Sequence, residues 1–147
     1  MAEVVLRHLI AEDPLLTDHV NVTSAGTANW HVGSPMDPRA RAALDRAGYR
    51  GAGTPGAYAD TAFLDRQDLI VVMTREHLSD VQLRLSNADT EVMLWRSLLE
   101  SGHNLDVADP YYGDDDEFDE CLAILSAGGQ RLTSALRSRL DQHARDV

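Results

Sequence analysis

The sequence is poor in cysteine, with Cys121 the single one among 147 residues. One thiol excludes an intrachain disulfide and a metal cage built from several cysteines, and it fits a reducing compartment. Long hydrophobic runs are also absent, since no stretch approaches the roughly 18 apolar residues of a membrane span. Residues 1–11 are typical of an amphipathic helix rather than of a basic flank followed by an apolar signal segment. We therefore expect a cytoplasmic protein.

Basic side chains are scarce as well. There are 13, all arginine, against 24 acidic residues, so the formal net charge is −11. This charge repels nucleic-acid backbones and anionic membrane surfaces, and neither partner is expected. The six histidines show no paired spacing of the kind that metal ligands adopt. The sequence thus predicts no metal and no cofactor, and any phosphate-handling pocket has to be local.

Hydrophobic periodicity predicts helices and strands in alternation. The predicted helices cover residues 1–11, 38–47, 59–66, 75–85 and 116–139, the last of them interrupted at Gly128 and Gly129. The predicted strands cover residues 19–25, 69–73 and 91–94. This order is typical of an α/β domain with a mainly parallel sheet flanked by helices, and residues 1–147 are long enough for one such domain.

Two of these elements have strong local signals. Asp37 is suited to cap a helix, Pro38 to the first helical position and Gly48 to a left-handed exit. The β-branched run at 69–73 is typical of a parallel strand covered on both faces. One part is missing from the expected pattern, because parallel α/β domains usually begin with a strand and a ligand-binding turn ahead of the first helix.

Two sequence blocks resemble those of a known family. Residues 23–40 (TSAGTANWHVGSPMDPRA) and 106–113 (DVADPYYG) are similar to the low-molecular-weight protein tyrosine phosphatases, and DLIVVMTREHLSDV falls at that family's third strand and following helix. The similarity covers essentially the whole chain. It implies a three-layer sandwich and hydrolysis of aryl phosphate monoesters through a cysteinyl-phosphate intermediate, with a phosphotyrosine protein or a small aryl phosphate as partner.

The resemblance also implies an absent segment. In the family, the helix similar to residues 1–11 follows a central strand and a phosphate loop, C-x5-R-S-P. We therefore expect that the sequence starts where this loop ends, shortened by an internal start codon or by truncation, without the nucleophilic cysteine or the phosphate-binding arginine. The missing strand would lie between residues 19–25 and 69–73. We predict that the 147 residues alone are poorly stable, aggregate, or are distorted where this strand is missing. Direct pairing of the strands at 19–25 and 69–73 would deform the phosphate pocket.

Five residues carry the implied site. By resemblance, Asp109 is the general acid that protonates the leaving phenolate, and Trp30, Tyr111 and Tyr112 are aromatic walls around the phosphotyrosine ring. Ser24 resembles a serine that braces the phosphate loop. The alternatives are that Asp109 is a turn aspartate before proline, that the three aromatic rings are partly buried core residues, and that Ser24 is a hydroxyl that bonds locally, which without the loop is the better account of Ser24.

Two features of the sequence argue against catalytic activity of the 147 residues alone. Cys121 follows two acidic residues on an apolar helical stripe, so we expect an inert core thiol rather than a nucleophile. Thr54-Pro55-Gly56-Ala57 stands where the family commonly has a histidine motif that supports its phosphate loop. We therefore predict that the 147 residues are inactive. The alternatives are a non-catalytic relative that binds a protein partner and, less favoured because only one cysteine is present, an arsenate reductase relative.

Overall fold

The computed structural model describes residues 1–51, 53–102 and 104–145. His103, one of the six histidines considered as metal ligands, lies outside the described residues. The elements in chain order are α1 (Ala2–Ala11), α2 (Pro14–His19), α3 (Pro38–Arg46), α4 (Thr61–Leu64), β1 (Leu69–Val72), α5 (Arg75–Arg84), β2 (Glu91–Leu94), the 3-10 helices η1 (Trp95–Leu98) and η2 (Pro110–Tyr112), and α6 (Asp115–His143). Within the described ranges, no helix is long and apolar enough to cross a membrane.

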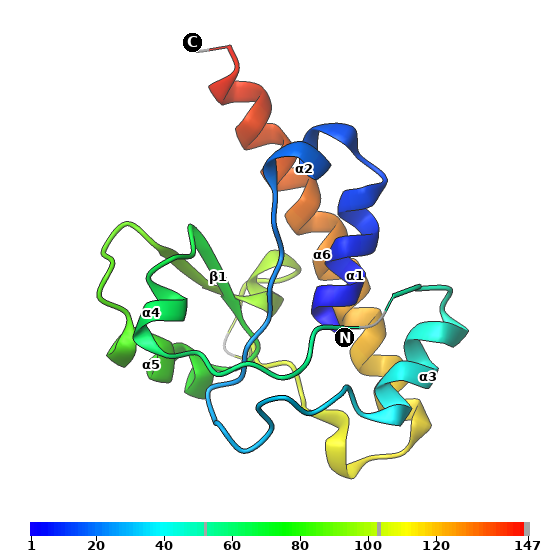
Figure 1. The fold of residues 1–147 in the computed structure, drawn as a ribbon. Coiled ribbons are helices and arrows are strands. Elements are labelled where there is room, and N and C mark those ends of the chain that lie inside the picture. The colour runs from blue at the N-terminus through cyan, green and yellow to red at the C-terminus, as the bar shows by residue number, and fades with distance from the viewer. Residues whose placement is uncertain (52, 103, 146–147) are drawn as a thin grey trace.

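A parallel sheet separates two groups of helices (Figure 1). Strands β1 and β2 pair in parallel, with Leu69 opposite Glu91 and Val72 opposite Leu94. Helices α1 and α6 pack against each other on one side of the sheet, and α4 and α5 lie on the other side. The predicted α/β fold with a parallel sheet flanked by helices is confirmed.

Capping side chains set where the helices begin. Asp37 accepts a hydrogen bond from the Arg39 backbone N–H at 2.8 Å, Pro38 opens α3, and Gly48 follows the helix with a φ of 84°. Asp114 and Glu117 form a reciprocal capping box at the start of α6. Both ends of α3 agree with the prediction because capping depends on residues within a single turn, whereas the capping box of α6 was not predicted.

The predicted interruption of the last helix is wrong, because α6 runs unbroken from Asp115 to His143. A Cβ atom at Gly128 would lie 2.1 Å from Nε1 of Trp95. The Trp95 side chain is 1% exposed, and its indole N–H donates to the Ile124 carbonyl at 3.2 Å. Gly128 is therefore required for close packing of the tryptophan and does not end the helix.

The predicted strand at residues 19–25 is also wrong. His19 ends α2, a short helix that Asp13 caps and Pro14 opens. Residues 20–25 are extended, but no described segment pairs with them as a strand, and the nearest pairing is an isolated parallel bridge between Gly26 and Tyr58. Alternating valines favour extended backbone, whereas a strand also needs a hydrogen-bonded neighbour.

A groove of about 560 Å³ lies between this extended segment and β1. We call it the interstrand groove. Its walls are residues 20–27 and Leu69–Val72, and apolar side chains of α1 and α6 line it, including Leu6, Ile10 and Leu132. The two flanking segments thus do not pair directly, because the interstrand groove separates them. The low stability expected of the 147 residues alone stays a prediction.

Candidate active site

The segment that carries Asp109 is held at the carboxyl end of β1. The Val107 backbone N–H donates to the Met73 carbonyl at 2.8 Å, and the Arg75 backbone N–H donates to the Asp106 carboxylate at 2.9 Å. The bond from the Arg75 backbone, followed by the Arg75 guanidinium, lowers the pKa of Asp106. The carboxyl ends of parallel strands are where α/β folds commonly place their ligand sites.

Asp109 caps the short helix η2. Its Oδ1 accepts a hydrogen bond from the Tyr111 backbone N–H at 3.0 Å, Pro110 opens the helix, and the Gly113 N–H closes the turn on the Pro110 carbonyl at 2.9 Å. The Asp109 side chain remains exposed. A carboxyl group in this position is fixed in direction and accessible to a substrate.

The two tyrosines that follow project from the same turn. Their rings meet edge to face, with centroids 5.1 Å apart. Tyr111 is 49% exposed and Tyr112 is 96% exposed. Neither ring is therefore a core residue, and both offer aromatic surface next to Asp109.

Arg39 holds this turn in place, which the sequence reasoning missed. Its guanidinium donates to the carbonyls of Tyr111 at 2.8 Å and Gly113 at 3.1 Å, and lies 4.8 Å from the centre of the Phe118 ring. The guanidinium also pairs with Asp37 at 2.9 Å and so lowers the pKa of that carboxyl. The available signal was a positive charge in the first turn of a helix, where the helix dipole disfavours it.

We expect the exchange Arg39→Gln to loosen η2 without unfolding α3. Both carbonyls lose a charged donor, so amide hydrogen exchange at Tyr111 and Gly113 is expected to rise by about tenfold. Arg41→Gln is the matched control, because Arg41 lies on the same helix and donates instead to Gly51. Equal exchange rates in the two variants would show that Arg39 does not hold the turn.

Ser24 lies at a buried carboxylate. Its hydroxyl donates to Oε2 of Glu3, which also accepts a 2.8 Å bond from the Thr54 hydroxyl. Glu3 is 5% exposed, and the Arg7 guanidinium lies 2.8 Å from its other oxygen, out of line for a hydrogen bond. The hydrogen bond of Ser24 is therefore not local in sequence. Thr54, the first residue of the segment that replaces the family's histidine motif, donates to the same Glu3 oxygen.

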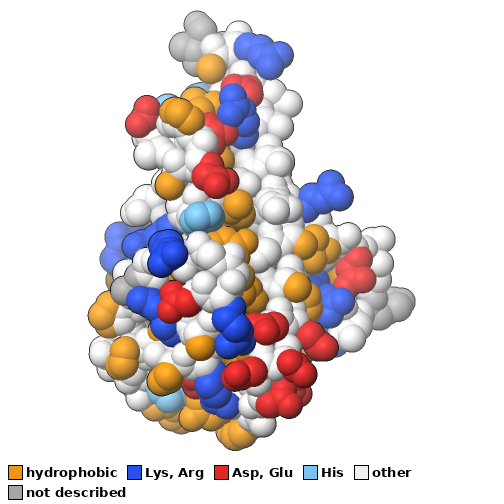
Figure 2. Space-filling view, turned by 90° about the vertical axis from the view of Figure 1, so that its right-hand side faces the viewer, with side chains coloured by type: hydrophobic (Ala, Val, Ile, Leu, Met, Phe, Trp, Pro, Cys, Tyr) orange, Lys and Arg blue, Asp and Glu red, His pale blue; other side chains and the backbone are white. Residues whose placement is uncertain are grey.

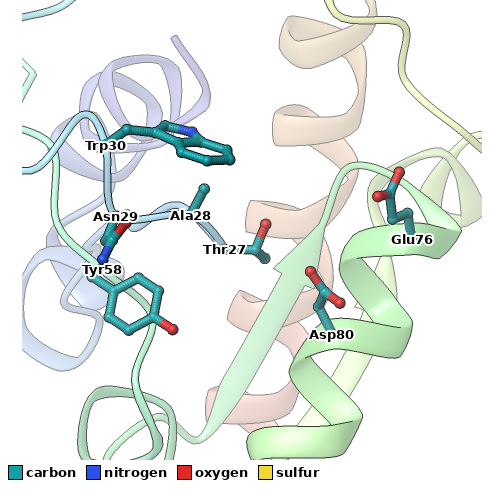
Figure 3. A pocket seen from close by; sticks show the side chains of 7 residues that line it. All are labelled: Thr27, Ala28, Asn29, Trp30, Tyr58, Glu76 and Asp80. Carbon is teal, nitrogen blue, oxygen red and sulfur yellow. The ribbon is translucent and has the colours of Figure 1, made fainter.

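The Trp30 side chain is 80% exposed. It lines a cavity of about 400 Å³ that includes Tyr58, Glu76 and Asp80 (Figure 3). The described residues that line this cavity do not include Tyr111 or Tyr112. The structure thus brings Asp109 together with the two tyrosines and sets Trp30 on a separate wall.

Cys121 is buried on the inner face of α6, and burial raises the pKa of its thiol. A protonated, buried thiol is a poor nucleophile. In the part of the chain that the structure describes, no group of three or more His, Cys, Asp or Glu side chains could hold a metal ion. Figure 2 shows arginine and acidic side chains together on one face of the molecule. The acidic side chains gather along its lower edge.

Several solved structures of tyrosine phosphatases have a similar fold. The chain resembles a low molecular weight phosphotyrosine phosphatase from Vibrio cholerae with a TM-score of 0.82 and 25% identity, covering 94% of this chain and 88% of the other. A protein tyrosine phosphatase from Entamoeba histolytica shares the fold with a TM-score of 0.84 at 23% identity, over 93% and 87% of the two chains. The class is therefore an α/β fold of the tyrosine phosphatase type.

Sequence comparison identifies the family within this class. The model of the low molecular weight phosphotyrosine protein phosphatase family matches residues 1–142. A low molecular weight protein-tyrosine-phosphatase of Streptomyces coelicolor is 36% identical over 149 residues, covering 98% of this chain and 89% of the relative. The chain belongs to the low molecular weight phosphotyrosine protein phosphatase family.

Proposed function

We propose that this fold hydrolyses aryl phosphate monoesters such as phosphotyrosine, with Asp109 as general acid and with Trp30, Tyr111 and Tyr112 as aromatic surfaces for the substrate. The observation that supports this most is the exposed carboxyl of Asp109 on a short helix anchored by Arg39, with two exposed tyrosines directly after it. Ser24 is proposed as a support of the phosphate loop. The family membership supports the same reaction class.

The proposed reaction has two displacements. A cysteine thiolate attacks phosphorus, the bond between phosphorus and the aryl oxygen breaks, and Asp109 protonates the departing phenolate, whose conjugate acid has a pKa of about 10. Water then attacks phosphorus, the sulfur–phosphorus bond breaks, and the Asp109 carboxylate takes the proton of that water. Asp109 thus serves as acid first and as base second.

The thiolate has to come from a C-x5-R loop, which these 147 residues do not contain. Cys121 is the single cysteine, and the sixth residue after it is Ala127 rather than arginine. We therefore propose that the 147 residues alone do not turn over aryl phosphates, because a nucleophile and a charged anchor for the phosphate oxygens are both required.

The test compares the 147-residue chain with the same chain extended at its N-terminus by an apolar strand and a C-x5-R-S-P loop. We expect hydrolysis of phenyl phosphate only in the extended chain, with a rate gain on the order of 10⁶ or more over the unextended one. Exchange of the loop cysteine for serine should abolish turnover, and Cys121→Ser should leave it unchanged. Turnover by the unextended chain that survives Cys121→Ser would contradict the proposal.

A binding module without catalysis is the second candidate. The exposure of Trp30 and Tyr112, at 80% and 96%, favours it, because exposed aromatic rings are typical of protein-binding surfaces. The extended chain separates the two functions. A binding module would retain phosphotyrosine peptides without releasing phosphate, whereas a phosphatase would release it.

A further inference from the structure

The cavity at Trp30 joins an aromatic wall to an acidic wall. We call it the Trp30 pocket; its lining residues are Thr27, Ala28, Asn29, Trp30, Tyr58, Glu76 and Asp80, and its volume is about 400 Å³. Figure 3 shows the Trp30 and Tyr58 rings on one side and the carboxylates of Glu76 and Asp80 facing them from α5. The pocket therefore brings aromatic rings and carboxylates together around one cavity.

Backbone hydrogen bonds fix the aromatic wall. The Gly26 N–H donates to the Ala57 carbonyl at 2.9 Å, and the Ala59 N–H donates to the Gly26 carbonyl at 3.0 Å. Further along, the Gly33 N–H donates to the Gly56 carbonyl at 2.8 Å. These bonds join the backbone segment that carries Trp30 to the one that carries Tyr58.

The charges at the pocket leave it anionic. Asp80 lies 3.8 Å from Arg84, whose guanidinium is 5.3 Å from the centre of the Tyr58 ring. Glu76 is exposed and has no ion-pair partner among the described residues. Two carboxylates and one guanidinium give a net charge of −1. Arg84 already demonstrates that a guanidinium is accepted against the Tyr58 ring, and the Trp30 ring remains 80% exposed.

We infer that the Trp30 pocket binds a basic side chain of a partner protein, arginine foremost. A guanidinium can stack on Trp30 while its N–H groups donate to the Glu76 and Asp80 carboxylates. The volume lies within the roughly 300–1,000 Å³ range of small-ligand sites. The net charge of −11 also favours approach of a basic segment.

A backbone hydrogen bond joins α5, which carries Glu76 and Asp80, to the segment that carries Asp109. Arg75, the neighbour of Glu76, donates through its backbone N–H to Asp106, three residues before Asp109. We therefore extend the inference to phosphotyrosine substrates that carry a basic residue near the phosphotyrosine. This substrate preference rests on the proposed function, whereas binding of the basic side chain itself does not.

Two indole signals in a ¹H–¹⁵N spectrum test the inference with a peptide that carries no phosphate. Trp30 is exposed, whereas Trp95 is 1% exposed with its N–H bonded to Ile124. Titration of the N-terminally extended chain with acetyl-Gly-Arg-Gly-amide is expected to shift the Trp30 signal saturably and to leave Trp95 in place. The citrulline peptide, which keeps the shape and lacks the charge, is expected to bind about tenfold more weakly.

Removal of one carboxylate gives the matched variant. Glu76→Gln is expected to lower the affinity for the arginine peptide by about three- to tenfold. Glu120→Gln, which removes the same charge from an exposed position on α6, is expected to leave the affinity unchanged. Absence of a saturable Trp30 shift, equal binding of the citrulline peptide, or equal effects of the two variants would overturn the inference. Because no phosphate is transferred, such an outcome would leave the proposed hydrolysis standing.

Discussion

Exchange of Asp109 for asparagine, in a chain that carries the C-x5-R-S-P segment, is expected to lower kcat on phenyl phosphate by about 10²–10⁴. Asparagine can still accept the hydrogen bond that Asp109 receives from the Tyr111 N–H, so the turn keeps its shape. It cannot release a proton to the leaving phenolate. The loss therefore measures proton transfer rather than a change of structure.

The dependence on the leaving group makes this experiment sharper. A nitrophenolate is more stable as an anion than phenolate, so the Asp109→Asn variant should lose less activity on nitrophenyl phosphate than on phenyl phosphate. Asp116→Asn is the control, because Asp116 is an exposed aspartate in the first turn of α6. Similar rates for Asp109→Asn and Asp116→Asn on phenyl phosphate would remove Asp109 from its proposed role.

An apolar strand joined to the N-terminus and able to fill the interstrand groove is expected to raise the Tm by about 10–20 °C, equivalent to roughly 5 kcal/mol for a chain of this size. The groove of about 560 Å³ is lined by apolar side chains of α1 and α6, and β1 pairs with β2 on its other edge. A strand in the groove would bury that apolar surface and supply hydrogen-bond partners to the backbone of both walls. The free energy gained in this way exceeds the conformational entropy cost of ordering a few residues.

Calorimetry and dye binding measure this effect. The 147-residue chain is expected to bind the hydrophobic dye ANS and to associate as its concentration rises, because open apolar edges pair with other chains. The extended chain should do neither. A strand of equal length with proline at alternate positions is the control, since proline cannot donate to a sheet. A sharp, cooperative melt of a soluble monomer of the 147 residues, unchanged by the added strand, would contradict the prediction.

Much of the local structure was predictable because its causes lie within a few residues. The cap at Asp37, the exit at Gly48 and the capping box of Asp114 and Glu117 each depend on one helical turn. The apolar run at 69–73 predicts a strand by composition alone. The same holds for Asp109, because an aspartate before proline and two tyrosines define the cap and the short helix by themselves.

The errors of prediction share a different cause. Residues 20–25 have the alternation of a strand, but a strand depends on a neighbour, and none of the described segments supplies one. Gly128 has the composition of a helix break, yet the Trp95 ring that packs on it comes from an element more than thirty positions earlier in the chain. Local pattern gives no information about such partners.

The sequence by itself determined most of the helices, the strands at Leu69–Val72 and Glu91–Leu94, the cap at Asp37, and the aspartate–proline turn that carries the proposed acid. Only the tertiary structure decided what holds that turn, since Arg39 reaches Tyr111 across 72 positions. It also decided that Ser24 and Thr54 meet at buried Glu3, and that Trp30 faces Glu76 and Asp80. The physical reason is range: capping and backbone preference act within a turn, whereas these contacts exist only after distant segments have packed.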